Sequence, residues 1–345
     1  MTPKQRFLAA LNLEEPDRVP VFYQHLGGAK WILQSCGKTM KEGFHDPEVF
    51  AEIAMQSHKL FGFDNVMAGW GDILIEAQAH GTIWKWPERD FYPRVEKYAI
   101  VSTSDIEKVE PIDPIKDRFW SVPIRAAGIM LSRMGKEVEV MGCIDSPLLI
   151  AMEMMGAENL YMKLIQEPDM IAELIAKVTE SSMLYGERIS ETGLGSVMLE
   201  NGTAGAEQNS PDLCDRFDMK YLGVVLDKYR SLGLKTVVHN CAAIPFLDKE
   251  IALKPNAIHF NNKAVDLPMI FEKMKGRTCV VSGIDHTELM FKGKQQAVED
   301  EVKRVIEIWG KAPGFIIAPG CEMPFKTPIE NILSLVAAAE RYGRS

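Results

Sequence analysis

The side chains of this sequence best suited to hold a metal are His239 and Cys241, which are separated by one residue, and Cys321, which lies far downstream. Alternate residues of a strand share a face, so a His-x-Cys pair at a strand end directs both ligands to the same side. Three nitrogen and sulfur ligands with one open position describe a catalytic zinc site, whereas structural zinc sites are normally closed by four ligands. The alternative is a buried core histidine with two unrelated thiols.

The charge of such a zinc centre indicates its chemistry. Two thiolates cancel the charge of Zn²⁺ and a neutral imidazole adds none, so the metal would be electron-rich. It could lower the pKa of a substrate thiol until the thiolate exists near pH 7, or act as a Lewis acid on the oxygen of a methyl ether. By microscopic reversibility, one site can serve methyl transfer in either direction.

Further polar side chains follow strand-like runs, where the active sites of α/β barrels lie. Glu200 is a candidate for a fourth, displaceable ligand or for a proton acceptor, and a helix-capping or solvated carboxylate is its alternative. Asp72 and His25 are candidates for acid–base roles, although an aspartate at a strand end more often caps the next helix. Trp70 and Asn261 are expected to line the substrate pocket.

Short apolar runs alternate with helical patterns along the whole chain. Their near-continuous hydrophobicity is typical of parallel strands that are buried on both faces. Eight such units predict a single (β/α)8 TIM barrel, and an open doubly wound sheet is the structural alternative. The eight runs are Val19–Tyr23, Asn65–Gly69, Val138–Gly142, Ser196–Leu199, Lys235–Val238, Ala257–Phe260, Thr278–Gly283 and Gly314–Ala318.

One stretch interrupts this rhythm. Residues 72–125 are rich in Trp, Pro and charge and lack clean periodicity, which predicts a lid-like insertion after the second strand of a distorted barrel. A surface excursion without function is the alternative. No linker rich in Gly or Ser divides the chain, so residues 1–345 are expected to form one domain.

Composition excludes several classes of protein. The 39 basic and 48 acidic residues give a net charge of −9, which argues against a nucleic-acid or anionic-membrane partner. No apolar run of membrane-spanning length occurs, and the charged N-terminus does not resemble an export signal, so we expect a cytoplasmic protein. Six scattered cysteines are too few for a disulfide framework in a chain of this size.

Several motifs resemble those of the uroporphyrinogen decarboxylase superfamily. The resemblance starts with Arg6–Leu11 and Glu15–Val21 and ends with Pro319–Cys321 and Thr327–Asn331, so it covers essentially the whole chain. It implies a single distorted TIM barrel with its site at the C-terminal mouth.

The decarboxylases of this superfamily bind porphyrinogen carboxylates through an arginine-rich segment after the first strand. The corresponding segment here, Tyr23–Ala29, contains no arginine, so a polycarboxylate substrate would lose its charge partners. Asp72 matches the catalytic aspartate of the decarboxylases. A metal-free decarboxylase that uses Asp72 is therefore the alternative enzyme.

The zinc methyltransferases of corrinoid-dependent metabolism form a second branch, and His239, Cys241 and Cys321 match their ligand pattern. This resemblance implies a zinc-dependent methyltransferase and a partner corrinoid protein whose cobalt gives or takes the methyl group. The small substrate would be a methyl ether donor, as in O-demethylation, or a thiol acceptor. A non-catalytic corrinoid- or tetrapyrrole-binding accessory protein is the second alternative.

Overall fold

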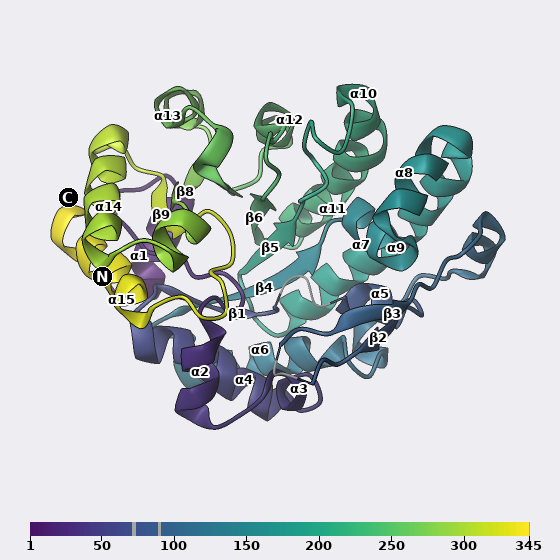
Figure 1. Ribbon diagram of the computed structural model, residues 1–345, viewed down its shortest axis with the longest axis horizontal. Coiled ribbons are helices and arrows are strands. Elements are labelled where there is room, and N and C mark those ends of the chain that lie inside the picture. Colours follow the sequence, from purple (N-terminus) through teal and green to yellow (C-terminus); the bar gives the residue numbers. More distant parts are fainter. Residues whose placement is uncertain (71–73, 89–90, 345) are drawn as a thin grey trace.

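The computed structural model describes residues 1–70, 74–88 and 91–344. Seven parallel strands form one curled sheet in the order β1-β4-β5-β6-β7-β8-β9, with helices around its outer face (Figure 1). The sheet strands are β1 (Asn65–Ala68), β4 (Glu139–Asp145), β5 (Ser196–Glu200), β6 (Lys235–Asn240), β7 (Ala257–Phe260), β8 (Cys279–Ile284) and β9 (Phe315–Pro319). All but one residue of these strands are buried, as expected for a parallel sheet with helices outside and side chains inside.

The helices follow the strands in the alternation that the sequence predicts. None of those in the described ranges combines the length and apolar character needed to cross a bilayer. The α-helices are α1 (Pro3–Leu11), α2 (Ala29–Cys36), α3 (Met40–Gly43), α4 (Pro47–Gln56), α5 (Ile75–Ala79), α6 (Ser121–Met134), α7 (Pro147–Met155), α8 (Ala157–Gln166), α9 (Pro168–Glu191), α10 (Pro211–Cys214), α11 (Lys220–Ser231), α12 (Leu247–Ala252), α13 (Leu267–Met274), α14 (Gln295–Trp309) and α15 (Ile329–Tyr342).

The first predicted strand, Val19–Tyr23, is not a regular strand, which corrects the expectation of eight. Val21 forms only an isolated parallel bridge with Ile317 of β9. On its other side, the side chains of Asp64 and Asn65 accept from the backbone N–H groups of Val21 (2.8 Å) and Tyr23 (2.7 Å). Pro20 has no N–H to add to a ladder. Side chains therefore replace part of the backbone pairing, and the barrel closes in a distorted form.

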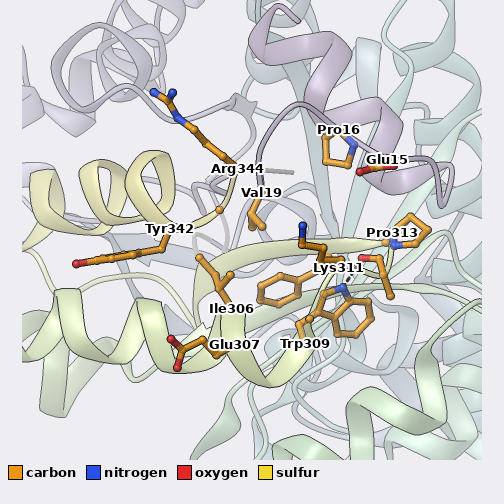
Figure 2. Close-up of a pocket in the computed structure, with 15 residues that line it drawn as sticks. Glu15, Pro16, Val19, Ile306, Glu307, Trp309, Lys311, Pro313, Tyr342 and Arg344 are labelled. Atoms are coloured by element: carbon orange, nitrogen blue, oxygen red, sulfur yellow. Dashed lines mark hydrogen bonds between the residues drawn. The ribbon is translucent and has the colours of Figure 1, made fainter.

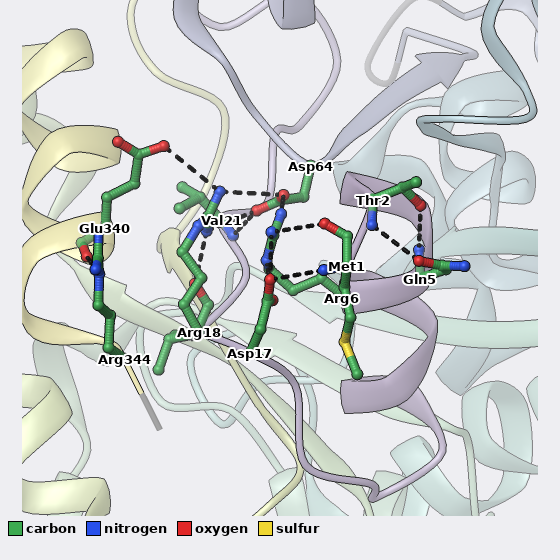
Figure 3. A network of polar contacts seen from close by, with 11 residues as sticks. Met1, Thr2, Gln5, Arg6, Asp17, Arg18, Val21, Asp64, Glu340 and Arg344 are labelled. Atoms are coloured by element: carbon green, nitrogen blue, oxygen red, sulfur yellow. Dashed lines mark hydrogen bonds and ion pairs between the residues drawn. The ribbon is translucent and has the colours of Figure 1, made fainter.

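A buried ion network supports this closure (Figure 3). Asp64, which is fully buried, accepts from Arg6 at 2.7 Å and from Arg18 at 3.0 and 3.2 Å. Arg6 also binds Asp17 at 2.6 and 3.0 Å. Arg6 and Arg18, which lie in or beside the opening motifs of the resemblance, thus hold the first helix and the following loop against the residue before β1.

Alternate residues of the strands fill the barrel interior. Met141, Met198 and Val281 pack there in one cluster with Phe7 and Leu11 of α1. The helix α1 therefore covers the N-terminal end of the barrel and leaves the C-terminal end as the mouth. A capping box starts this helix: the Thr2 side chain accepts from the backbone of Gln5, and the Gln5 side chain accepts from the backbone of Thr2.

The insertion after β1 contains the antiparallel hairpin β2 (Ile83–Lys85) and β3 (Arg94–Lys97). The chain between these strands contacts the loop after β9: the Tyr92 hydroxyl donates to Glu322 Oε1 at 2.7 Å, and the ring of Phe91 lies 5.8 Å from that of Phe325. The insertion thus contacts the loop that carries Cys321, as a lid would.

Candidate metal centre

Strand register places three polar side chains side by side in the barrel. Glu200 at the end of β5 pairs with His239 of β6, and His239 pairs with His259 of β7. Paired residues of neighbouring parallel strands point to the same face, so all three face the interior at the mouth. Both histidines are fully buried, and their rings lie 4.5 Å apart.

The three predicted metal ligands meet at this position. One nitrogen of His239 and the sulfur atoms of Cys241 and Cys321 all lie within 4.8 Å of one another, and His239 Nε2 is 3.5 Å from Cys321 Sγ. Cys241 is exposed, Cys321 is half-buried and His239 is buried, so the group sits at the boundary between interior and solvent. Gly202 leaves room there, because a Cβ at this position would lie 3.2 Å from Cys241 Sγ.

The donor set suits zinc. One imidazole and two thiols are the soft ligands that zinc prefers, and three protein ligands leave a fourth position for a substrate atom. Burial and the neighbouring His259, His25 and His286 lower the pKa of His239 well below its usual value. His239 is therefore neutral near pH 7, which is the form that binds a metal.

Glu200 lies between two histidines. Its Oε1 is 2.9 Å from His25 Nε2, and its Oε2 is 3.6 Å from His239 Nε2. His25 is 2% exposed and has a φ of +49°, in the left-handed region that a residue with a side chain seldom adopts. The turn after Val21–Tyr23 thus holds the imidazole against the carboxylate, in reach for proton exchange.

Besides His259, the structure adds two residues that the sequence did not single out for the site. Cys143 Sγ lies 3.8 Å from Glu200 Oε1, so His25, Cys143 and Glu200 form a second, buried donor group. Gln24 Nε2 lies 3.3 Å from the same Glu200 oxygen. The signal that could have found Cys143 is its register position, two residues before Asp145, which pairs with Glu200.

The remaining predicted site residues differ in where they lie. Trp70 is 1% exposed and stacks on Phe50 at 3.9 Å, within the core between sheet and helices. Asn261 lies near the three ligands: its backbone N–H donates to the Asn240 carbonyl at 3.4 Å, and it packs against Gly320, which precedes Cys321. Its Oδ1 accepts from the backbone N–H of Lys263 at 3.1 Å and caps a short turn. Asp72 lies outside the described residues.

A cavity of about 190 Å³ opens beside Cys321. Among the described residues that line it there is no lysine, arginine or histidine, and its polar groups include the hydrogen-bonded pair Tyr92 and Glu322. The rest of its lining is apolar or aromatic: Ala29, Met40, Phe91, Met323, Pro324 and Phe325.

A second cavity, of about 220 Å³, lies at the opposite end of the barrel (Figure 2). It is bounded by the loop at Glu15–Val19, the end of α14 and the start of β9, so it is remote from the three ligands. Its lining contains Trp309, whose Nε1 already donates to the Ala312 carbonyl at 2.6 Å.

The chain is similar to known proteins over nearly its whole length. The family model described as uroporphyrinogen decarboxylase (URO-D) matches residues 2–342. The chain is 24% identical over 345 residues to the methylcobamide:CoM methyltransferase MtbA of Methanosarcina mazei, covering 99% of this chain and 98% of that relative. It is 24% identical over 343 residues to MtaA, the methylcobamide:CoM methyltransferase of Methanosarcina barkeri, with the same two coverages. The solved structure of a methyltransferase from Methanosarcina mazei matches with a TM-score of 0.89 and 23% identity, covering 99% of both chains.

Proposed function

The chain belongs to the uroporphyrinogen decarboxylase family, and from this membership we propose that it is a zinc-dependent methyltransferase that exchanges a methyl group between the cobalt of a corrinoid protein and a small substrate. The observation that carries the proposal is the convergence of His239, Cys241 and Cys321 within 4.8 Å at the barrel mouth. The methylcobamide:CoM methyltransferases among its relatives support the corrinoid partner.

The ligand residues fit zinc and would hold it through His239 Nε2 and the sulfurs of Cys241 and Cys321. When bound, zinc supplies Lewis-acid activation of a substrate sulfur or oxygen at its fourth position. The exposed position of Cys241 keeps this side of the centre open to solvent and to a partner protein.

Glu200 and His25 are proposed to accept and donate the proton that methyl transfer releases or consumes. A thiol that becomes a thioether loses a proton, and an ether that loses its methyl group needs one. The Glu200 carboxylate can accept a proton from the substrate side and exchange it with His25, whose Nε2 is 2.9 Å away. The pair thus serves either direction of transfer.

The described lining of the cavity beside Cys321 is mostly apolar and aromatic, and its polar groups include Tyr92 and Glu322. We propose that this cavity receives the small substrate, which is a methyl ether donor, as in O-demethylation, or a thiol acceptor. The aromatic side chains suit the apolar part of either substrate.

Metal analysis of two matched cysteine variants tests the zinc site. We expect the wild-type protein to hold about one zinc ion per chain, as a site with one open position requires. Cys241→Ser is expected to lose both zinc and methyl transfer, because the variant lacks one of the three ligands. Cys143→Ser, which changes a buried thiol of the neighbouring donor group, is expected to keep its zinc.

Activity is measured by the visible absorbance of cob(I)alamin and methylcobalamin with a panel of methyl ethers and thiols. A metal-free protein that decarboxylates a substrate would contradict the proposal and support the decarboxylase. Tight corrinoid binding without turnover would support the accessory protein instead.

A further inference from the structure

A buried glutamate outside the metal centre holds the two strand ends that carry its residues. Asn201 directly follows Glu200, and Asn240 directly follows His239. The side-chain amides of both asparagines donate to the same oxygen, Glu250 Oε1, at 2.8 and 3.0 Å. Strand alternation accounts for this arrangement: Glu200 and His239 face the barrel interior, so the next residue on each strand faces the helices outside.

The same asparagine shapes the loop that carries Cys241. Asn240 Oδ1 accepts from the backbone N–H of Ala242 at 3.0 Å, and its Nδ2 also donates to the Ala204 carbonyl at 3.0 Å. The backbone N–H of Asn201 donates to the His239 carbonyl at 2.7 Å. The loops after β5 and β6 are therefore joined by one set of hydrogen bonds centred on Asn240.

These groups are removed from solvent. Asn201, Asn240 and Glu250 are each fully buried, so a lost hydrogen bond would not be replaced by bulk water. Glu250 lies on α12, which follows the Cys241 loop directly. Glu250 Oε1 thus binds the ends of both β5 and β6. Because Glu250 itself lies on α12, it also ties together the two ends of the loop between β6 and α12.

We infer that Glu250 is a positioning residue of the metal centre: it sets the place of Cys241 relative to His239 and Glu200 through the amides of Asn240 and Asn201. The inference rests on the proposed function for the identity of the metal. Groups that orient metal ligands from behind commonly change metal affinity 10- to 100-fold when they are removed.

Three substitutions of Glu250 in the full chain test this role. Glu250→Leu removes the acceptor at similar volume and is expected to weaken zinc binding about 10- to 100-fold and to shift the absorption bands of the Co²⁺-substituted protein. Glu250→Asp shortens the side chain and is expected to shift the spectrum in the same way but less. Glu250→Gln keeps an oxygen acceptor and is expected to retain the spectrum and to bind zinc within about threefold of the wild type.

Glu139→Leu is the matched control. Glu139 is also buried, at 2% exposure, and accepts from Ser196 at 2.6 Å, but it lies at the opposite, N-terminal end of the barrel. This variant is expected to lose stability without a change in the cobalt spectrum. An unchanged spectrum in folded Glu250→Leu would overturn the inference, and so would a shift in Glu250→Gln or Glu139→Leu as large as the shift in Glu250→Leu.

A measurement on the metal-free protein separates this inference from the proposed function. Backbone hydrogen exchange across residues 239–246 is expected to be faster in Glu250→Leu and Glu250→Asp than in the wild type, and unchanged in Glu250→Gln and Glu139→Leu. A wild-type protein without zinc but with this exchange pattern would reject the proposed function and leave the positioning role intact. Equal exchange in all variants would reject the positioning role even if zinc were bound.

Discussion

Glu200 is the residue whose replacement separates proton handling from metal binding. Its carboxylate lies 2.9 Å from His25 and 3.6 Å from His239. We predict that Glu200→Gln lowers the rate of methyl transfer about 100-fold, because the amide cannot take up a proton. Stopped-flow absorbance of the cobalt centre measures the rate, and atomic emission measures zinc.

The zinc content of Glu200→Gln shows why the variant transfers methyl groups more slowly. One zinc ion per chain is expected to remain, since three other ligands hold it. A parallel loss of zinc and rate would instead identify Glu200 as a ligand, and an unchanged rate would remove it from the mechanism.

Residue types and strand alternation sufficed to predict that His239, Cys241 and Cys321 lie together, because each follows or ends a recognisable strand. The places of Cys143 and His259 could not be predicted in the same way. Both lie on apolar strands, where an interior position at the mouth looks like any core position until the register of neighbouring strands is known. Trp70 was expected to line the pocket because it follows a strand. An aromatic residue at such a position can equally point towards the helices, and Trp70 does so and stacks on Phe50.

At the scale of elements, the contact between the segment Val19–Tyr23 and β1 depends on one carboxylate. Asp64 binds two guanidinium groups and one backbone N–H, and it is fully buried. We predict that Asp64→Ala lowers the free energy of unfolding by about 3–5 kcal/mol, because it leaves two charges poorly paired in the interior. Urea denaturation followed by circular dichroism measures this change.

Asp17→Ala is the control for that prediction. Asp17 also pairs with Arg6, but its side chain is 41% exposed, so its removal is expected to cost at most about 1 kcal/mol. Equal losses in the two variants would contradict the importance of burial at Asp64.

The hydrogen bond between Tyr92 and Glu322 joins the insertion to the loop of Cys321. Because both residues line the cavity beside the metal centre, we predict that Tyr92→Phe raises the KM for the small substrate several-fold, in keeping with the loss of one hydrogen bond to a charged group. Zinc content and kcat are expected to change little. Steady-state kinetics at saturating corrinoid measures both constants, and an unchanged KM would show that the insertion does not shape the pocket.

The elements themselves were largely predictable, and the one failure has a physical cause. Buried apolar runs between helix signals identified seven strands and their order along the chain. The run Val19–Tyr23 has the same composition, yet Asp64 and Asn65 take over much of its pairing through their side chains. The hydrophobic pattern of a segment does not show which distant group will accept a hydrogen bond from its backbone N–H groups.

At the scale of the whole molecule, three buried carboxyl groups make stability depend on pH. Burial is the largest cause that raises the pKa of Glu76 to about 7, of Asp218 to about 7 and of Glu250 to about 8. Each folded-state pKa lies above the value in the unfolded chain, so the stabilising effect is present below the unfolded value and is lost as pH rises through the folded one. Buried histidines such as His259, whose pKa falls to about 3, act mainly at lower pH.

We therefore predict that the unfolding temperature of the metal-free protein falls between pH 7 and 8.5. In this interval the unfolded chain has already lost these three protons while the folded chain still gives them up. Differential scanning calorimetry across the interval measures the slope, and Glu250→Gln is expected to flatten it. A temperature that stays constant or rises in the wild type would contradict this prediction.

The bridge between Val21 and Ile317 also bears on how the protein is made. Phe22 donates to the Ile317 carbonyl at 2.9 Å, and Ile317 donates back to the Pro20 carbonyl at 2.9 Å, so the two partners lie far apart in the sequence. On the ribosome, the first of these segments emerges long before the second exists. The edge of residues 20–23 that faces β9 therefore stays unpaired until β9 has been made, so ring closure follows the pairing of the strands that precede β9 in the sequence.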